Sequence, residues 1–175
     1  MPRLLRLQTL LAEELKLLLD AESQWLQALP DLTQAARSLH LARWMEELTE
    51  RTFHQHDRLL AAVGPVTRSR RCRAMTSVIR DLEAATRQPT DSLVGDVALM
   101  VKLQPALCLQ VCAYRTAHTL ARILMEDGVA RLLARSLVEE ERDDQELSSM
   151  IVDSCTDGGA TGPSQGLSGQ IHSLI

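Results

Sequence analysis

Apolar residues recur every three or four positions along most of this 175-residue chain. One stripe near the start of the chain consists of Leu7, Leu10, Leu11, Leu15 and Leu18. A second stripe consists of Leu41, Trp44, Met45, Leu48 and Leu59. This spacing places side chains on one face of an α-helix, whereas a half-buried strand would alternate every second residue. The pattern therefore predicts long amphipathic helices.

Aromatic residues are scarce, with one Phe, one Tyr and two Trp in the whole chain. The core must therefore be built mainly from Leu, Ala, Val and Met. Strands are enriched in aromatic and β-branched residues, so this composition favours helices over sheet. A chain of this length fits one domain with a sizeable buried core.

Turn signals divide the periodic pattern into five segments, and we expect helices at residues 5–37, 38–63, 71–87, 91–125 and 129–152. Pro30 should kink or briefly break the first helix, and "EDG" at 126–128 should form the last turn. This order predicts an all-α four-helix bundle over residues 1–152, with an extra short helix between its second and third helices. Residues 153–175 are rich in Gly and Ser, which predicts a disordered tail.

Composition argues against several functions. The net charge is −4 and few aromatics could stack on bases, so we expect no nucleic-acid binding. We find no run of about 18 apolar residues, so we expect no membrane span. Four cysteines without disulfide-framework spacing favour a reduced, cytoplasmic protein. The arginine-rich stretch at 68–73 is expected to form ion pairs or to meet an acidic patch on a partner.

Three motifs occur in a distinctive order: "AESQWLQALPDLTQAA" at 21–36, "RCRAM" at 71–75 and "LLARSLVEEERDDQEL" at 132–147. Together they resemble the YciF-type ferritin-like family, a stress-associated group of bacterial bundle proteins whose function is poorly defined. The resemblance covers about residues 8–152. It implies a ferritin-like bundle and a role in the stress response.

Ferritin-like bundles can hold two metal ions between carboxylates and histidines that project inward from four helices. Iron and manganese ions prefer hard oxygen ligands, which the carboxylates supply. The resemblance assigns Glu22, Glu140 and Asp144 to acidic positions of this centre. The last two are four residues apart, so we expect them on one side of the final helix.

The opposing helices depart from the family pattern. Arg51 stands where the family usually has an acid, and Gln55 where a histidine is common. On the fourth helix, a Glu-His-Tyr-Glu stretch is replaced by Leu107, Cys108, Leu109 and Gln110. Three carboxylates are too few to bridge two divalent ions, so we expect a non-catalytic protein without a cofactor. Arg51, near Glu22 or Glu140, would then replace the positive charge of the metal.

Two alternatives remain open. The chain could be an oxidoreductase or peroxide-handling protein that keeps a reduced iron or manganese site at Glu22, Glu140 and Asp144. It could also be a scaffold protein unrelated to any metal-binding ancestor. A relocated site at Glu50 and His54 is less favoured, because His54 and His56 point to different helix faces and suit a solvated surface.

Further expectations concern packing. Cys108 and Cys112 are predicted to be small buried apolar residues, and Arg142, Asp143 and Glu146 to form a solvated outer face. Leucines in the first helix cover more than one face, which is more than a bundle seam requires. That excess predicts a homodimer or contact with another protein partner.

Overall fold

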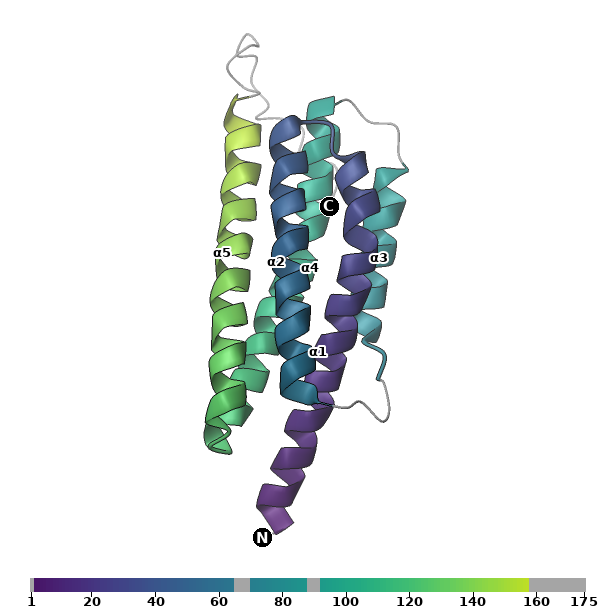
Figure 1. Ribbon diagram of the computed structural model, residues 1–175. Helices are drawn as coiled ribbons and strands as arrows, with labels where there is room; N and C mark the ends of the chain where they lie inside the picture. The colour runs from purple at the N-terminus through teal and green to yellow at the C-terminus, as the bar shows by residue number, and fades with distance from the viewer. Residues whose placement is uncertain (1, 65–69, 88–91, 158–175) are drawn as a thin grey trace, which may run out of the picture.

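The computed structural model describes residues 2–64, 70–87 and 92–157, and these form five α-helices with no strand among them. The helices are α1 (Pro2–Ala35), α2 (Leu39–Val63), α3 (Arg73–Thr86), α4 (Ser92–Ile123) and α5 (Asp127–Asp157). Figure 1 shows the four long helices side by side, with α3 along one flank. The predicted all-α bundle with an extra short helix is confirmed.

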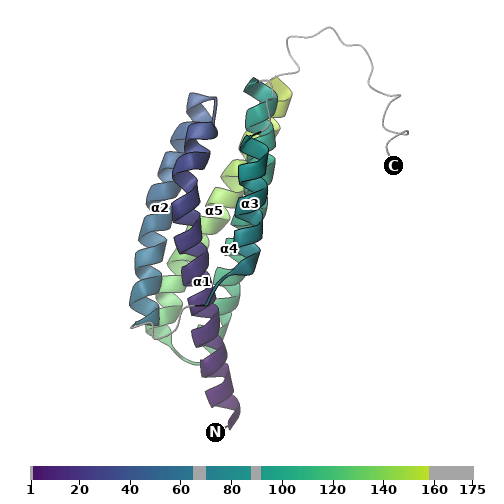
Figure 2. The same cartoon turned by 90° about the vertical axis from the view of Figure 1, so that its right-hand side faces the viewer.

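The short helix α3 determines the topology. α1 and α2 form one antiparallel pair, and α4 and α5 form another (Figures 1 and 2). α3 runs back along the bundle and packs against α1 and α4, so α4 begins at the same end as α2 and runs parallel to it. A crossover of this kind is one of the known connections of four-helix bundles.

Two boundaries differ from the sequence predictions. α1 continues through Pro30 as one helix, so the predicted short break is absent. Pro30 is exposed, and water can therefore bond the carbonyl of Leu26 that lacks an N–H partner. α5 extends to Asp157, so residues 153–157 belong to a helix and not to a tail. The rest of the predicted tail, 158–175, lies outside the described residues.

The turn between α4 and α5 is centred on Met125, which has a left-handed backbone with φ of 58°. The N–H of Glu126 donates to the carbonyl of Ala121 at 3.0 Å, and the N–H of Met125 donates to that of Arg122 at 3.2 Å. This is a Schellman motif, in which the left-handed residue is usually glycine. The turn therefore lies before the predicted "EDG", and Asp127 already belongs to α5.

Buried Asp96 on α4 fixes the connection between α1 and α2. Its two carboxylate oxygens accept hydrogen bonds from the backbone N–H groups of Arg37 at 2.8 Å and Ser38 at 2.7 Å. Ser38 in turn caps α2 by accepting from the N–H of Leu41. The first helical hairpin is thus joined to the second one at this end of the bundle.

α4 is unusually apolar. Its segment Val94–Ile123 is long and apolar enough to cross a membrane by length and composition, which the sequence analysis did not expect. The interior helix of a bundle meets the same criterion, and α4 packs against α1, α3 and α5. Cys108 and Cys112 are exposed on its outer face, so their predicted burial is wrong.

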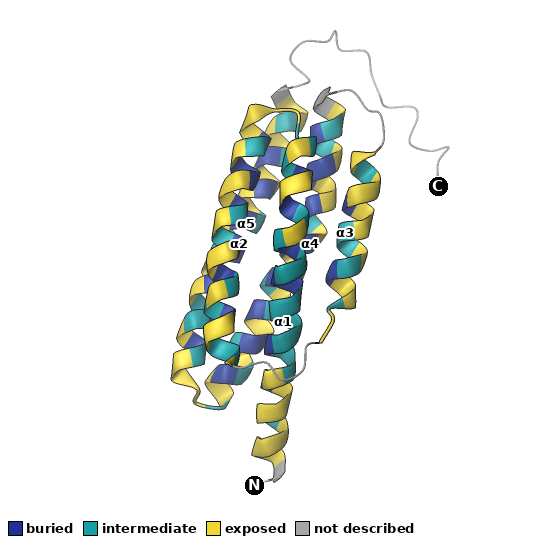
Figure 3. Ribbon diagram, turned by 45° about the vertical axis from the view of Figure 1, so that its right-hand side comes forward, coloured by how far each residue is buried: buried dark blue, intermediate teal, exposed yellow. Residues whose placement is uncertain are grey.

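The buried core is divided into two apolar clusters. One contains Trp25, Leu29, Met45, Leu107 and Leu147, among others. The other contains Leu15, Leu18, Leu59, Ala117 and Leu133, among others. Figure 3 shows how buried positions follow the inward faces of the helices. Near the junction of these two clusters, each long helix carries a buried polar residue, namely Glu22, Gln55, Gln110 and Glu140.

Candidate functional site

Five buried side chains form what we call the polar layer: Glu22 on α1, Gln55 on α2, Gln110 and Tyr114 on α4, and Glu140 on α5. Four of them are 0% exposed, and Glu140 is 2% exposed. Burying polar groups is costly unless they are paired. The polar layer is therefore the feature of the core that packing alone does not explain.

Helical periodicity directs these side chains inward. Glu140 lies seven residues after Leu133 and seven before Leu147, and both leucines are buried. Residues at this spacing share one helix face. Gln55 likewise follows buried Leu48 by seven positions and precedes buried Leu59 by four. The polar layer thus occupies positions that a simple apolar bundle would fill with leucine.

Hydrogen bonding in the polar layer is incomplete. The hydroxyl of Tyr114 donates to Oε1 of Glu22 at 2.6 Å. Oε2 of Glu22 and Oε2 of Glu140 have no partner, and neither do the amide atoms of Gln55 and Gln110. Gln110 faces Glu22 and Gln55 faces Glu140, but neither amide reaches good hydrogen-bonding geometry. The layer therefore contains several buried oxygens and nitrogens that could bind a further group.

The electrostatics favour neutral side chains. Burial raises the pKa of Glu22 to about 8, although the hydrogen bond from Tyr114 and the charge of Arg58 oppose this rise. Burial, followed by the charges of Glu22 and Asp143, raises the pKa of Glu140 well above its ordinary value. Burial also raises the pKa of Tyr114. Near neutral pH, the protonated form of Glu22 thus predominates, and burial favours the neutral forms of Glu140 and Tyr114 as well.

Asp143 lies beside the polar layer and is 0% exposed, so its predicted place on a solvated face is wrong. Nε of Arg51 donates to its Oδ2 at 3.0 Å, and Arg142 contacts its Oδ1 at 3.4 Å. Burial raises the pKa of Asp143, and both arginines oppose part of that rise. Arg51 therefore meets a buried carboxylate as predicted, but its partner is neither Glu22 nor Glu140.

Asp144 does not enter the polar layer. It is partly buried between α4 and α5, where its carboxylate accepts a hydrogen bond from Gln104 and contacts Sγ of Cys108 at 3.5 Å. Burial and the nearby Asp144 raise the pKa of the Cys108 thiol. Of the three predicted site residues, the structure brings Glu22 and Glu140 into the layer and leaves Asp144 at its edge.

The structure also shows where the other residues considered as metal-ligand positions lie. Leu107 is buried in an apolar cluster, whereas Gln110 reaches the polar layer together with Tyr114. His54 and Glu50 are exposed, whereas Nε2 of His56 lies 3.0 Å from the hydroxyl of Ser23. Over residues 2–64, 70–87 and 92–157, no three His, Cys, Asp or Glu side chains gather as a metal site.

Sequence reasoning missed Tyr114 and Thr52, both of which are fully buried. The available signal for Tyr114 was its spacing, since it follows buried Leu107 by seven residues. Thr52 precedes Gln55 by three residues, just as Glu140 precedes Asp143 by three. Dimetal bundles use this spacing for their Glu-x-x-His pairs. The two buried pairs therefore have the sequence spacing of such motifs but contain no histidine.

Comparisons with known proteins identify the family of the chain. A family model described as "Domain of unknown function (DUF892)" matches residues 6–158. The chain belongs to this family. Protein YciF of Escherichia coli is 26% identical over 136 residues, which are 75% of this chain and 82% of that protein. The predicted resemblance to YciF-type proteins is therefore confirmed.

Two solved structures share the fold. The E. coli stress protein YciF has a TM-score of 0.82 and 24% identity, and the match covers 86% of this chain and 97% of that one. YcfI from Rhodopseudomonas palustris, described as a putative structural protein, has a TM-score of 0.76 and 25% identity, with 81% and 92% covered. Neither description names a ligand or a reaction.

Proposed function

We propose that this chain is a non-catalytic bundle protein with a structural or interaction role linked to the stress response. The E. coli relative is described as a stress protein, and the R. palustris structure as a putative structural protein. Both descriptions suit a role that depends on the fold and its surfaces. Four free cysteines suit a reducing compartment, and we propose a cytoplasmic location.

The composition of the polar layer supports this proposal most directly. A dimetal bundle supplies one Glu from each of two helices and a Glu-x-x-His pair from each of the other two. Here the corresponding layer has two carboxyls, and neutral amides and a phenol fill the remaining positions. Asp143, a further buried carboxylate, is already paired with Arg51. Two divalent ions would therefore lack ligands to balance their charge.

Metal content and iron oxidation test the proposal together. The chain is produced in medium supplemented with iron and manganese, and its metals are quantified by mass spectrometry. We expect well under one ion per chain and no faster oxidation of Fe²⁺ than in buffer. One or more tightly bound ions per chain, together with catalysed oxidation, would contradict a non-catalytic role.

A second candidate function has a specific observation in its favour. The unpartnered oxygens of Glu22, Glu140, Gln55 and Gln110 could together hold a single iron or manganese ion, which would stabilise the two carboxyls in their ionised form. This is the reduced-site alternative without Asp144. It predicts one ion per chain in the wild type and none in the Glu22→Gln/Glu140→Gln variant, whereas the leading proposal predicts no difference.

The amino-terminal end of α1 supports an interaction role. Figures 1 and 2 show this end extending past the other helices. Leu4, Leu5 and Leu10 are exposed there, at 58%, 67% and 44%. We propose that a second copy of the chain covers these leucines in a homodimer. Exposed apolar side chains that gather on one segment commonly mark an interface.

Sedimentation at high micromolar concentration tests the dimer. The wild type should sediment as a dimer, and a variant with Ser at Leu4, Leu5 and Leu10 as a monomer. Leu39, Leu60 and Val138 are exposed elsewhere on the bundle, so the matching triple Ser variant serves as the control and should remain dimeric. A wild type that sediments strictly as a monomer would exclude this interface.

A further inference from the structure

A surface hollow of about 440 Å³ lies over the first half of α3. It is lined by Arg71, Arg73, Thr76, Ser77 and Arg80, which supply three guanidinium groups, two hydroxyls and no carboxylate. We propose that this hollow binds the phosphate groups of a small phosphorylated ligand. The lining of this hollow shares no residue with the polar layer, and the proposal does not depend on the function proposed above.

The three arginines are not neutralised by ion pairs within residues 2–64, 70–87 and 92–157. Two other arginines of this region do have acidic partners, since Arg70 contacts Glu13 at 2.5 Å and Arg87 contacts Glu83 at 3.5 Å. Like charges around one hollow repel each other, and this repulsion is relieved when an anion binds between them. Guanidinium groups bind phosphate in a planar, two-pronged arrangement that gives both affinity and orientation.

The fold holds this end of α3 in place. Asp20 on α1 accepts a hydrogen bond from the backbone N–H of Cys72 at 2.7 Å. Gln24 donates to the carbonyl of Cys72 at 3.1 Å and accepts from the hydroxyl of Thr76 at 2.7 Å. The nearby carboxylate of Asp20 is thus engaged by neutral donors instead of by an arginine.

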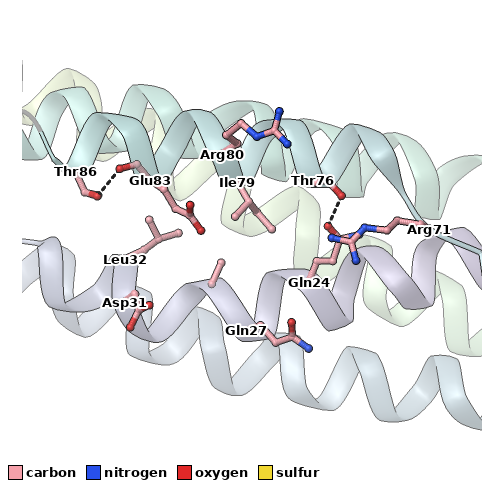
Figure 4. Close-up of a pocket in the computed structure, with 11 residues that line it drawn as sticks. Gln24, Gln27, Asp31, Leu32, Arg71, Thr76, Ile79, Arg80, Glu83 and Thr86 are labelled. Carbon is pink, nitrogen blue, oxygen red and sulfur yellow. Dashed lines mark hydrogen bonds between the residues drawn. The ribbon is translucent and has the colours of Figure 1, made fainter.

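The spacing of the three arginines in the sequence favours an arrangement in which their guanidinium groups lie around the same hollow. Arg73 and Arg80 are seven residues apart and share a face of α3. Long helical side chains lean toward the amino-terminal end, which brings Arg80 back toward Arg73. Figure 4 shows Arg71 and Arg80 on either side of Thr76. No acidic residue occupies the first turn of α3 to compete with an anion.

An adjoining hollow indicates the rest of the ligand. It measures about 320 Å³, shares Arg71, Thr76 and Arg80, and continues between α1 and α3 (Figure 4). Its lining includes the amide of Gln27 and the carboxylate of Asp31. A ligand with a phosphate at the arginines and hydroxyl groups toward the amide and carboxylate oxygens would match both hollows. Neither lining contains an aromatic residue, so base stacking by a nucleic acid is disfavoured.

Inorganic diphosphate is a suitable probe, and calorimetry at constant ionic strength measures its binding. We expect one saturable site on the full chain. The Arg71→Gln/Arg73→Gln/Arg80→Gln variant should bind about tenfold more weakly or worse, because three charge-assisted contacts are lost. The control replaces Arg43, Arg122 and Arg131 by Gln, which removes the same charge from exposed sites outside both hollows. The control should bind within about twofold of the wild type.

Several outcomes would overturn the proposal. These are no saturable binding to the wild type, equal losses in both triple variants, or amide NMR shifts that cluster away from residues 72–80. Tighter binding of a single-stranded oligonucleotide, lost in the first variant alone, would show that the site serves nucleic acid instead. If that variant fails to fold by circular dichroism, the single Arg73→Gln and Arg80→Gln variants test the same expectation through losses of about threefold each.

Discussion

The hydroxyl of Tyr114 lies 2.6 Å from Oε1 of Glu22 and joins α4 to α1 in the middle of the bundle. The two residues are 92 positions apart in the sequence. Both are fully buried, so neither can exchange this hydrogen bond for one with water. The contact belongs to the polar layer, and bundle proteins in general build metal sites from inward-facing side chains at such positions.

Replacing Tyr114 by Phe should lower the free energy of unfolding by about 1–3 kcal/mol, because the buried Glu22 loses its donor. Urea denaturation at pH 7 measures the loss. Thr119→Val is a matched control, since its exposed hydroxyl bonds only a carbonyl of its own helix. The control should change stability by less than about 0.5 kcal/mol. Equal stability of Tyr114→Phe and the wild type would show that the contact contributes little.

The free energy of unfolding should decrease as the pH rises, because the pKa of Glu22 is raised in the folded protein. The pKa of Glu22 is about 8 in the folded protein, compared with an ordinary value of 4.5. Between these values the folded chain keeps a proton that the unfolded chain has lost, so the contribution of Glu22 to stability is present below 4.5 and declines as pH rises toward 8. Glu140 acts in the same direction.

Glu22→Gln should therefore flatten the decline between pH 5 and pH 8 and make the protein more stable than the wild type at pH 8. Denaturation midpoints across this range provide the measurement. Gln keeps an oxygen that can accept from Tyr114, so the hydrogen bond is preserved. A wild-type stability that rises steadily from pH 5 to pH 8, with the same slope in Glu22→Gln, would disprove the raised pKa.

The ion pair between Arg51 and Asp143 should be costly to break. Asp143 is fully buried, so Arg51→Met leaves a poorly compensated carboxylate and should destabilise the fold by about 3 kcal/mol. Adding Asp143→Leu should recover most of that loss, because both charges are then gone. A double-mutant cycle by chemical denaturation measures this coupling. Additive effects of the two changes would indicate that the residues act independently.

Met125→Gly should stabilise the turn between α4 and α5 by about 1 kcal/mol, because glycine adopts positive φ without steric cost. Met125 is 84% exposed, so little packing is lost. Thermal unfolding should show a higher midpoint. Gly64, at φ of 66°, provides the reverse control, and Gly64→Ala should lower the midpoint. A lower midpoint for Met125→Gly would indicate that its side chain contributes more than the backbone strain costs.

The family resemblance placed Glu22 and Glu140 at inward positions, and helical periodicity predicted the bundle well. It could not decide between Asp143 and Asp144. At about 100° per residue, these side chains lie roughly 60° and 40° to either side of Glu140, so both are near the core. Asp143 was assigned to the wrong face because the charged run from 139 to 146 offers no apolar neighbour to orient it.

The inward face of α4 could not be predicted from its sequence. The helix α4 carries apolar side chains on several of its faces. Val94 and Val101 are exposed, whereas Leu103 and Leu107 are buried. Without a polar face, its sequence does not show which side is inward, and this explains the wrong placement of Cys108 and Cys112. The turn at Met125 was misplaced for a related reason, since the glycine that normally marks such a turn is absent from that position.

The protonation state of the polar layer tests the central claim most directly. Carbon-13 NMR of the metal-free chain, labelled at its glutamate carboxyls, can follow Glu22 and Glu140 by comparison with the Glu22→Gln and Glu140→Gln variants. We predict that both carboxyls remain largely protonated at pH 7. If both are ionised at pH 7 and titrate near their ordinary values, the layer is charged, and the account of a neutral core in place of a metal centre is contradicted.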